Sequence, residues 1–452
     1  MKKNDIIPMT VIDMTGQGSG ICKVDGMAVF VPMTAVGDVI EARILKVKKS
    51  YAFAKIERII SASDNRIESD CSCYAKCGGC VYRHIPYNEE LKIKRKRVYD
   101  ALTRIGGIKD FAIHDIIGCK EPNGYRNKTQ LPIGRETNGE VVMGFYGSHS
   151  HRIIPCEKCL LQPDEFNEIA AVCREWIEDN NISTYNEQTH MGLLRHLYMR
   201  KGFDSGEVMV CLVINGDAVP NIESLVSSLN RRFENIASII LNINKEKTNV
   251  IQGQTCKTIY GSDFITDTLC GLRFNISPLS FYQINHDQTQ RLYAKAKEYA
   301  MLTGDEFIID LYCGAGTIGL SMADECKRVL GVEIIPQAIE NARENAQQNN
   351  IKNAEFICGD ASDAAEKLAK KGETPDVVVI DPPRKGCSGD VISAIVKMSP
   401  KRVVYVSCEP ETLARDLAMF NERGYGTAEV TPVDMFPRTA SVETVARLEK
   451  KR

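Results

Sequence analysis

A cysteine and a glutamate in the C-terminal part of the sequence lie in contexts that suit covalent catalysis. Cys408 directly follows the apolar segment RVVYVS and begins CEPETLARD, and Glu443 lies within DMFPRTASVETVARL. A thiolate can attack an electron-poor carbon, and a carboxylate can then accept a proton from the adduct. An isolated cysteine at a strand end is more often structural, so the neighbouring motifs decide. These positions predict Cys408 as a nucleophile and Glu443 as a general base, provided that both reach the same sheet edge.

A glycine-rich segment predicts a nucleotide cofactor site. DLYCGAGTIGL lies between an apolar strand segment and a helical one, and Glu333 ends the next strand segment. Glycines let the backbone approach a ligand, and an acidic residue in this place accepts hydrogen bonds from ribose hydroxyls. Both features fit a dinucleotide as well as S-adenosylmethionine (SAM). Asp310, before the glycines, and DPPRKG (381–386), at the end of the fourth strand segment, favour SAM.

The shared edge of DPPRKG and Cys408 suggests what the thiolate attacks. A polar Asp-Pro-Pro segment at the carboxyl end of a parallel strand is suited to hold a nucleobase beside a methyl donor. C5 of uracil is too weak a nucleophile to attack SAM directly, so a thiolate must first add to C6. The proton on C5 must then leave before the thiolate can be expelled, which requires a base. The pattern predicts methylation of a pyrimidine at C5.

Two short segments rich in cysteine predict a metal site. CSCYAKCGGC and IPCEKC together contain six cysteines, namely Cys71, Cys73, Cys77, Cys80, Cys156 and Cys159. Cys73, Cys77 and Cys80 have the C-x-x-x-C-x-x-C spacing of radical SAM enzymes, but no β/α barrel pattern follows them. The pairs Cys77/Cys80 and Cys156/Cys159 are an alternative that would hold a structural zinc ion.

The hydrophobic pattern divides the chain into three parts. From residue 305 onward, apolar strand segments alternate with helical segments, which predicts a doubly wound parallel α/β sheet that binds SAM. Residues 1–61 alternate apolar and polar residues between glycine-rich turns, which predicts a small OB-like β-barrel resembling the TRAM domain of RNA-modifying enzymes. A mixed α+β central domain with the cysteine cluster covers 62–92 and 118–270. The catalytic domain is expected to combine 93–117 with 271–452.

Composition and charge limit the possible partners. The 452 residues are 43% hydrophobic and 26% charged with a net charge of −2, which is typical of a globular protein of several domains. The sequence has no apolar run of about 20 residues and no signal-like start, so we expect a cytoplasmic protein without a membrane partner. The basic runs KVKKSYAFAK and LKIKRKR, with Arg126, Lys128, Arg195 and Arg200, are candidates for contacts with RNA phosphates. No obligate protein partner is evident.

Taken together, the motifs resemble those of the RNA uracil-C5 methyltransferases. SPLSFYQIN, DLYCGAGTIGL, DPPRKG, SCEPETLARD and DMFPRTASVE occur in the family's order, and the similarity spans nearly the whole chain. The resemblance implies that Cys408 is the nucleophile, that Glu443 accepts the proton, and that SAM or the target base is contacted by Gln283, Tyr312, Glu333 and Asp381. Two positions depart from the family: Glu409 replaces a common asparagine, and Ser441 replaces a common histidine.

The resemblance also implies a metal centre and a class of RNA. Family members hold a [4Fe-4S] cluster with four cysteines, which here correspond to Cys71, Cys77, Cys80 and Cys159. Members with both a TRAM domain and this cluster typically modify ribosomal RNA, so 23S rRNA is favoured over tRNA. The alternatives are a tRNA uridine methyltransferase, an RNA cytosine-C5 methyltransferase and a non-catalytic RNA-binding protein. Cytosine enzymes usually present a Pro-Cys motif, whereas Cys408 follows Ser407.

Overall fold

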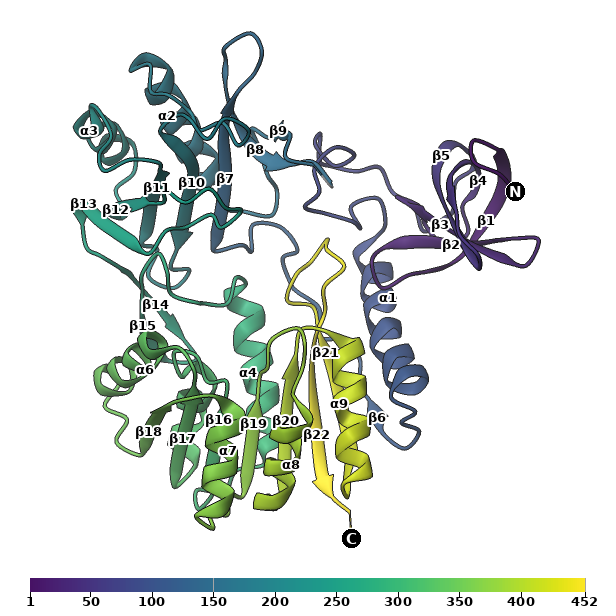
Figure 1. The fold of residues 1–452 in the computed structure, drawn as a ribbon, viewed down its shortest axis with the longest axis vertical. Helices are drawn as coiled ribbons and strands as arrows, with labels where there is room; N and C mark the ends of the chain where they lie inside the picture. The colour runs from purple at the N-terminus through teal and green to yellow at the C-terminus, as the bar shows by residue number, and fades with distance from the viewer. Residues whose placement is uncertain (149, 452) are drawn as a thin grey trace.

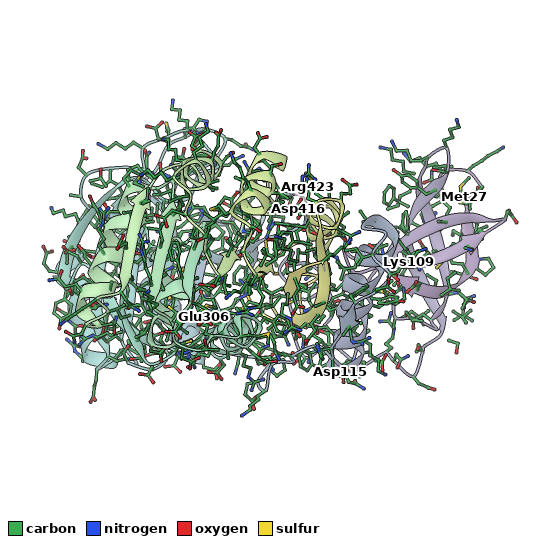
Figure 2. All side chains as sticks on the ribbon, turned by 90° about the horizontal axis from the view of Figure 1, so that it is seen from below. Met27, Lys109, Asp115, Glu306, Asp416 and Arg423 are labelled. Carbon is green, nitrogen blue, oxygen red and sulfur yellow. The ribbon has the colours of Figure 1, made fainter. Side chains whose placement is uncertain are left out.

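The computed structural model describes residues 1–148 and 150–451, which form a barrel, a central sheet and a C-terminal sheet (Figure 1). The five N-terminal strands close into a barrel in the order β1-β2-β3-β5-β4. Their alternating apolar side chains, among them Val11, Val29 and Ile40, fill its interior. The predicted barrel is confirmed. In Figure 2, where Met27 is labelled on the barrel, the barrel projects from one end of the molecule. The strands are β1 (Ile6–Met14), β2 (Ser19–Val24), β3 (Met27–Pro32), β4 (Val39–Val47) and β5 (Tyr51–Ser61).

The central part is a mixed sheet in the order β13-β12-β11-β10-β7-β8-β9. Strand β11 is buried along its whole length because both faces of the sheet are covered. Helices α2 and α3 pack against one face, with Phe166 and Leu225 in the shared core. The other face packs against the hairpin β14–β15 and thereby against the C-terminal domain. The elements are β7 (Lys128–Arg135), β8 (Val141–Tyr146), β9 (Ile153–Pro155), α2 (Asp164–Asp179), β10 (Leu194–Lys201), β11 (Val208–Ile214), α3 (Ile222–Arg232), β12 (Ile236–Ile243), β13 (Thr255–Gly261), β14 (Ile265–Leu269) and β15 (Leu272–Ile276).

The C-terminal part is an α/β sheet in the order β18-β17-β16-β19-β20-β22-β21-β6. The chain runs outward from β16 to β18 and then returns to β19 on the other side of β16, so the carboxyl ends of β16 and β19 form a topological switch point. The predicted doubly wound sheet is confirmed, although β22 runs antiparallel between β20 and β21. The strands are β6 (Ala112–Ile113), β16 (Phe307–Leu311), β17 (Arg328–Glu333), β18 (Ala354–Cys358), β19 (Val377–Ile380), β20 (Arg402–Ser407), β21 (Tyr425–Val433) and β22 (Glu443–Lys450).

Helices cover both faces of this sheet, and one of them comes from far upstream in the sequence. Helix α1 continues into the π-helical turn η1, which packs against α9, while β6 joins the edge of the sheet. Figure 1 shows α1 between the barrel and the C-terminal sheet. The helices are α1 (Tyr87–Asp100), η1 (Ala101–Ile105), α4 (His286–Ala300), α5 (Thr317–Met322), η2 (Ala323–Glu325), α6 (Pro336–Gln348), α7 (Ala361–Lys370), α8 (Gly389–Met398) and α9 (Pro410–Glu422).

The structure corrects part of the expected phosphate-binding set. Arg195 and Arg200 are 3% and 1% exposed, and their guanidinium groups donate to backbone carbonyls inside the protein. In LKIKRKR, Lys94 and Arg97 are also buried, each paired with carboxylates. The prediction was wrong for these four residues because their charges are satisfied internally. Among the described residues, no helix is both long and apolar enough to cross a bilayer.

Candidate active site

Sheet pairing brings the predicted nucleophile and the predicted base together. Cys408 is the first residue after β20, and Glu443 is the first residue of β22. The two strands are antiparallel neighbours in which Ser407 pairs with Thr444. Cys408 follows Ser407 and Glu443 precedes Thr444, so these two residues lie beside each other at the end of the pair. Asp381 directly follows β19, the parallel neighbour of β20 on its other side. Three side chains capable of chemistry therefore share one sheet edge.

Burial raises the pKa of all three groups, and Asp381 adds to the shift of the other two. Burial raises the pKa of Cys408 to about 11, and the carboxylates of Glu443 and Asp381 add to the shift. Burial and Asp381 raise the pKa of Glu443, which is 5% exposed, to about 8. Burial raises the pKa of Asp381 to about 7. Arg384 partly opposes the first two shifts. The resting thiol is protonated near neutral pH, and the neighbouring carboxylate has a pKa suited to proton transfer.

Three of the four residues expected at the cofactor site line one cleft. Gln283, Tyr312 and Asp381 face a cavity of about 40 Å³ at the switch point, together with Tyr293 and Gly314. This enclosed space is far smaller than a SAM molecule. The chain turns from β16 into α5 through Tyr312, which has a φ of 65°, in the left-handed region. The cleft therefore lies where an open α/β sheet binds its ligands.

The fourth residue, Glu333, borders the same turn. Its carboxylate accepts hydrogen bonds from the backbone N–H of Gly314 at 3.2 Å and of Ile335 at 3.0 Å. Asp310, the acidic residue inside β16, accepts a hydrogen bond from the N–H of Gly319 at 2.9 Å. Burial raises the pKa of Asp310 to about 8. The two acidic residues anchor the glycine-rich turn at both of its ends.

The cysteine segments meet at a second, separate site. A cavity of about 250 Å³ is lined by all six cysteines of the two segments, with Arg83, Arg126 and Lys128 among the other lining residues. Cys71 to Cys80 come from the loop before α1, and Cys156 and Cys159 follow β9. Among the residues that the structure describes, no three His, Cys, Asp or Glu side chains converge on a position for one metal ion. A single zinc ion requires such convergence, because Zn–S bonds of about 2.3 Å place the sulfur atoms of its thiol ligands about 3.8 Å from one another.

The charges around this cavity suit an anionic group. Burial and the nearby Arg200 and Arg126 lower the pKa of Lys128 to about 8. The Nε of Arg126 is buried without a hydrogen-bond partner among residues 1–148 and 150–451. Burial raises the pKa of Cys80 to about 11, and Arg83 partly opposes this shift. A set of thiolates with bound metal would supply negative charge where these cations gather.

Some site residues were missed from the sequence. Arg384 lies beside Cys408 and Glu443, and its place in DPPRKG was an available signal. Tyr293 projects into the cofactor cleft from α4, where it looks like an ordinary core residue of an amphipathic helix. Cys73 and Cys156 line the cysteine cavity but are outside the set of four cysteines that the family resemblance implies as cluster ligands.

The strand order, the glycine-rich turn and the cleft at the switch point define a SAM-dependent methyltransferase fold. The family described as tRNA (Uracil-5-)-methyltransferase matches residues 240–451, and the TRAM domain matches residues 3–56. An RNA methyltransferase of Clostridium tetani, named uncharacterized, is 45% identical over 98% of this chain and 96% of its own length. A relative with the same description from Clostridium acetobutylicum is 46% identical over 100% and 98%.

One similar solved structure covers the whole molecule. The tRNA (uracil-54, C5)-methyltransferase of Pyrococcus abyssi, in complex with S-adenosyl-L-homocysteine, has a TM-score of 0.80 and 28% sequence identity. The alignment covers 98% of this chain and 100% of the archaeal one. This chain therefore belongs to the family of SAM-dependent RNA uracil-C5 methyltransferases, and the resemblance found in the sequence is confirmed.

Proposed function

We propose that this protein methylates C5 of a uridine in 23S rRNA, with Cys408 as the nucleophile and Glu443 as the general base. The main support for these two roles is the pairing of β20 with β22, in which the thiol and the carboxyl lie side by side at the switch-point edge. Asp381 completes this edge at the end of β19. No other described cysteine both follows a strand of this sheet and neighbours a buried glutamate.

The proposed roles follow from the chemistry of the uracil ring. Cys408 releases its proton to solvent and its sulfur bonds to C6, so that the electrons of the C5=C6 double bond move toward the C4 carbonyl. SAM, when bound, supplies the methyl group that C5 accepts. Glu443 then removes the proton from C5, and the electron pair of that bond re-forms C5=C6 while the C6–S bond breaks. Cys408 leaves as a thiolate and takes up the proton that Glu443 removed from C5, which regenerates the resting enzyme.

The residues that would hold SAM are Gln283, Tyr312, Glu333 and Asp381. Support comes from their common position around the glycine-rich turn, where Gln283, Tyr312 and Asp381 line one cleft and Glu333 accepts a hydrogen bond from Gly314. Glu333 at the end of β17 is placed to accept hydrogen bonds from ribose hydroxyls.

For the cysteine cavity we propose a [4Fe-4S] cluster held by Cys71, Cys77, Cys80 and Cys159. The six lining cysteines and the surrounding cations support an anionic thiolate cluster. In such a cluster each thiolate binds a different iron, so the sulfurs lie farther apart than around one zinc ion. With all four irons ligated by protein, the cluster would serve structure or RNA docking. It would tie the loop before α1 to the loop after β9.

The assignment of the RNA class rests on the domain combination. The TRAM-like barrel and the cysteine cavity occur together here, as in the ribosomal RNA members that the sequence resembles, whereas the archaeal neighbour is named for tRNA. We likewise propose domain boundaries of 1–61 for the barrel, 62–92 with 118–270 for the central domain, and 93–117 with 271–452 for catalysis. The packing of α1 and η1 on α9 and the pairing of β6 with β21 support the last of these.

The RNA class can be tested with isotope-labelled SAM and nucleoside analysis. Transcripts of 23S rRNA and of tRNA would be incubated with the enzyme, digested and separated by mass spectrometry. The proposal expects labelled 5-methyluridine from the rRNA. Label confined to tRNA would favour the tRNA alternative, and labelled 5-methylcytidine would contradict the uridine assignment.

A further inference from the structure

Arg97 of α1 contacts both of the loops that carry the proposed catalytic pair. Its guanidinium donates to Glu411 in two bonds, from Nε at 3.1 Å and from Nη2 at 2.7 Å, and Nη2 also donates to Glu409. Glu409 is the residue directly after Cys408. Nη1 donates to the backbone carbonyl of Ala440 at 3.1 Å, three residues before Glu443. One side chain, 9% exposed, thus joins residues 408–411, which include the start of α9 and are called the nucleophile loop below, to residues 434–442, the base loop.

The rest of α1 makes that guanidinium a fixed point. Glu90, Lys94 and Arg97 lie on one face of the helix at helical spacing. Lys94 donates to Glu90 at 2.7 Å and to Asp434 at 2.6 Å, and all three of these side chains are at most 1% exposed. Glu90 in turn accepts a hydrogen bond from the N–H of Arg438 at 2.7 Å. The helix therefore holds segment 434–440 at several points, and of the three only Arg97 is bonded to the nucleophile loop.

The barrel supports the same side chain from the other direction. A Cβ built on Gly16, in the turn between β1 and β2, would lie 2.6 Å from the Nε of Arg97 and 2.9 Å from its Cδ. Only a glycine lets this turn approach so closely. Beside the contact lies a cavity of about 200 Å³ that Gly16, Ile93, Arg97 and Glu411 help to line. The guanidinium is thus enclosed by the barrel, by α1 and by the two catalytic loops.

We infer that Arg97 is a positioning residue that sets the spacing between Cys408 and Glu443. Its bonds to Glu409, Glu411 and Ala440 hold the two loops in one arrangement, and the barrel turn at Gly16 keeps its side chain in place. This inference rests on the proposed roles of Cys408 and Glu443. Position 409, where the family commonly has asparagine, contributes to this arrangement, because the carboxylate of Glu409 pairs with the same guanidinium.

The test compares Arg97→Ala with Arg104→Ala in the full-length protein. Arg104 lies one helical turn beyond α1, and its side chain is 73% exposed with only a long contact to Asp100. We expect Arg97→Ala to lower kcat about 10- to 100-fold, because a small misplacement of reacting groups has an effect of this size. The KM for SAM should change little, since Arg97 is not among the residues lining the cofactor cleft. Arg104→Ala should behave like the wild type.

Chemical rescue separates positioning from a general effect on folding. Removing the Arg97 side chain enlarges the adjoining cavity, so added guanidinium chloride at millimolar concentration should restore part of kcat, whereas ammonium chloride should not. Arg97→Lys keeps the charge but loses the paired bonds to Glu411, so its kcat should fall between those of the wild type and Arg97→Ala. It also serves as the test if the alanine variant fails to fold.

A readout that needs no RNA keeps this inference distinct from the proposed function. The rate of Cys408 alkylation by iodoacetamide would be followed against pH by mass spectrometry of its peptide. Because burial and the nearby Glu443 and Asp381 raise the pKa of this thiol, loosening the loops should move the alkylation midpoint to lower pH in Arg97→Ala. An unchanged midpoint in both Arg97 variants, or a kcat equal to that of Arg104→Ala, would overturn the inference. A wild type that alkylates as expected but methylates no RNA would instead contradict the proposed function.

Discussion

The two thiol sites of this protein are surrounded by different ionisable groups. At the sheet edge, Cys408 lies beside Glu443 and Asp381, and these carboxylates help raise its pKa to about 11. In the cysteine cavity, Arg126 and Lys128 gather around thiols instead. A carboxylate environment favours the neutral thiol, which becomes a thiolate only when a substrate can accept it. A cationic environment works against burial, which raises the pKa of Cys80 to about 11, and so favours the thiolates that a bound metal would need.

The comparison accounts for the two purposes that we propose for one residue type in this chain. A transient nucleophile must also be a good leaving group, and a neighbouring base must be able to change its protonation state during turnover. A structural metal centre needs the reverse, since its ligands stay deprotonated and its position is fixed. The groups that surround each thiol, rather than the cysteine itself, match the two functions that we propose.

The largest expected effect comes from removing the base at the sheet edge. Glu443→Gln should lower turnover by a factor of about 10² to 10⁴, the usual contribution of a general base. The methylated RNA should remain bonded to Cys408 because its C5 proton cannot be removed. A denaturing gel would show this adduct, and the exposed Asp390→Asn, on α8, is the control. Fast turnover without an adduct would contradict the assignment of Glu443.

Single substitutions of cysteines in the cavity distinguish the two hypotheses for the bound metal, an iron–sulfur cluster and a zinc ion. For the iron–sulfur cluster, Cys71→Ser should lose the metal and Cys156→Ser should keep it. For the zinc ion held by two C-x-x-C pairs, the outcome reverses. Cys73→Ser is the matched control for both, since Cys73 lines the cavity but is a ligand in neither reading. Iron, zinc and acid-labile sulfide would be measured on protein purified without oxygen, and a metal-free wild type would contradict both readings.

The buried base should reduce stability at alkaline pH. The pKa of Glu443 is about 8 in the folded protein and about 4.5 when unfolded, so folding disfavours its ionised form. As pH rises from about 4.5 to 8, the unfolded state loses this proton first and stability falls. Glu443→Gln should therefore be more stable than the wild type by a few kcal/mol at pH 8, and the difference should shrink toward pH 5. Thermal unfolding at both pH values, with Asp390→Asn alongside, would check it; an equal difference at both would contradict the assigned burial.

The smallest effect is expected where the chain departs from its family. Glu409→Asn removes one carboxylate from Arg97 but leaves the paired bonds to Glu411 and the bond to Ala440. We expect kcat to fall by about fivefold or less, the worth of one hydrogen bond. Steady-state kinetics would measure it. A loss as large as that of Arg97→Ala would mean that Glu409 itself, not the guanidinium, positions Cys408.

Much of this organisation could be predicted from the sequence because it depends on local patterns. Alternating strands and helices predicted the sheet, and strands that end in DPPRKG and SCEP placed Asp381 and Cys408 at one edge. Arg97 could not be found in this way, since its partners lie more than 300 positions away and its basic run suggested phosphate binding. The same holds for Arg195 and Arg200, whose carbonyl partners are defined only by the folded sheet.

The central claim is that Cys408 activates C5 of uridine by adding to C6. The most direct measurement is the release of tritium from rRNA labelled at C5 of uridine, with SAM, for the wild type and for Cys408→Ala. The account predicts one tritium released for each methyl group transferred by the wild type, and release at background level for the variant. Methyl transfer by the wild type without release, or undiminished release by Cys408→Ala, would contradict it.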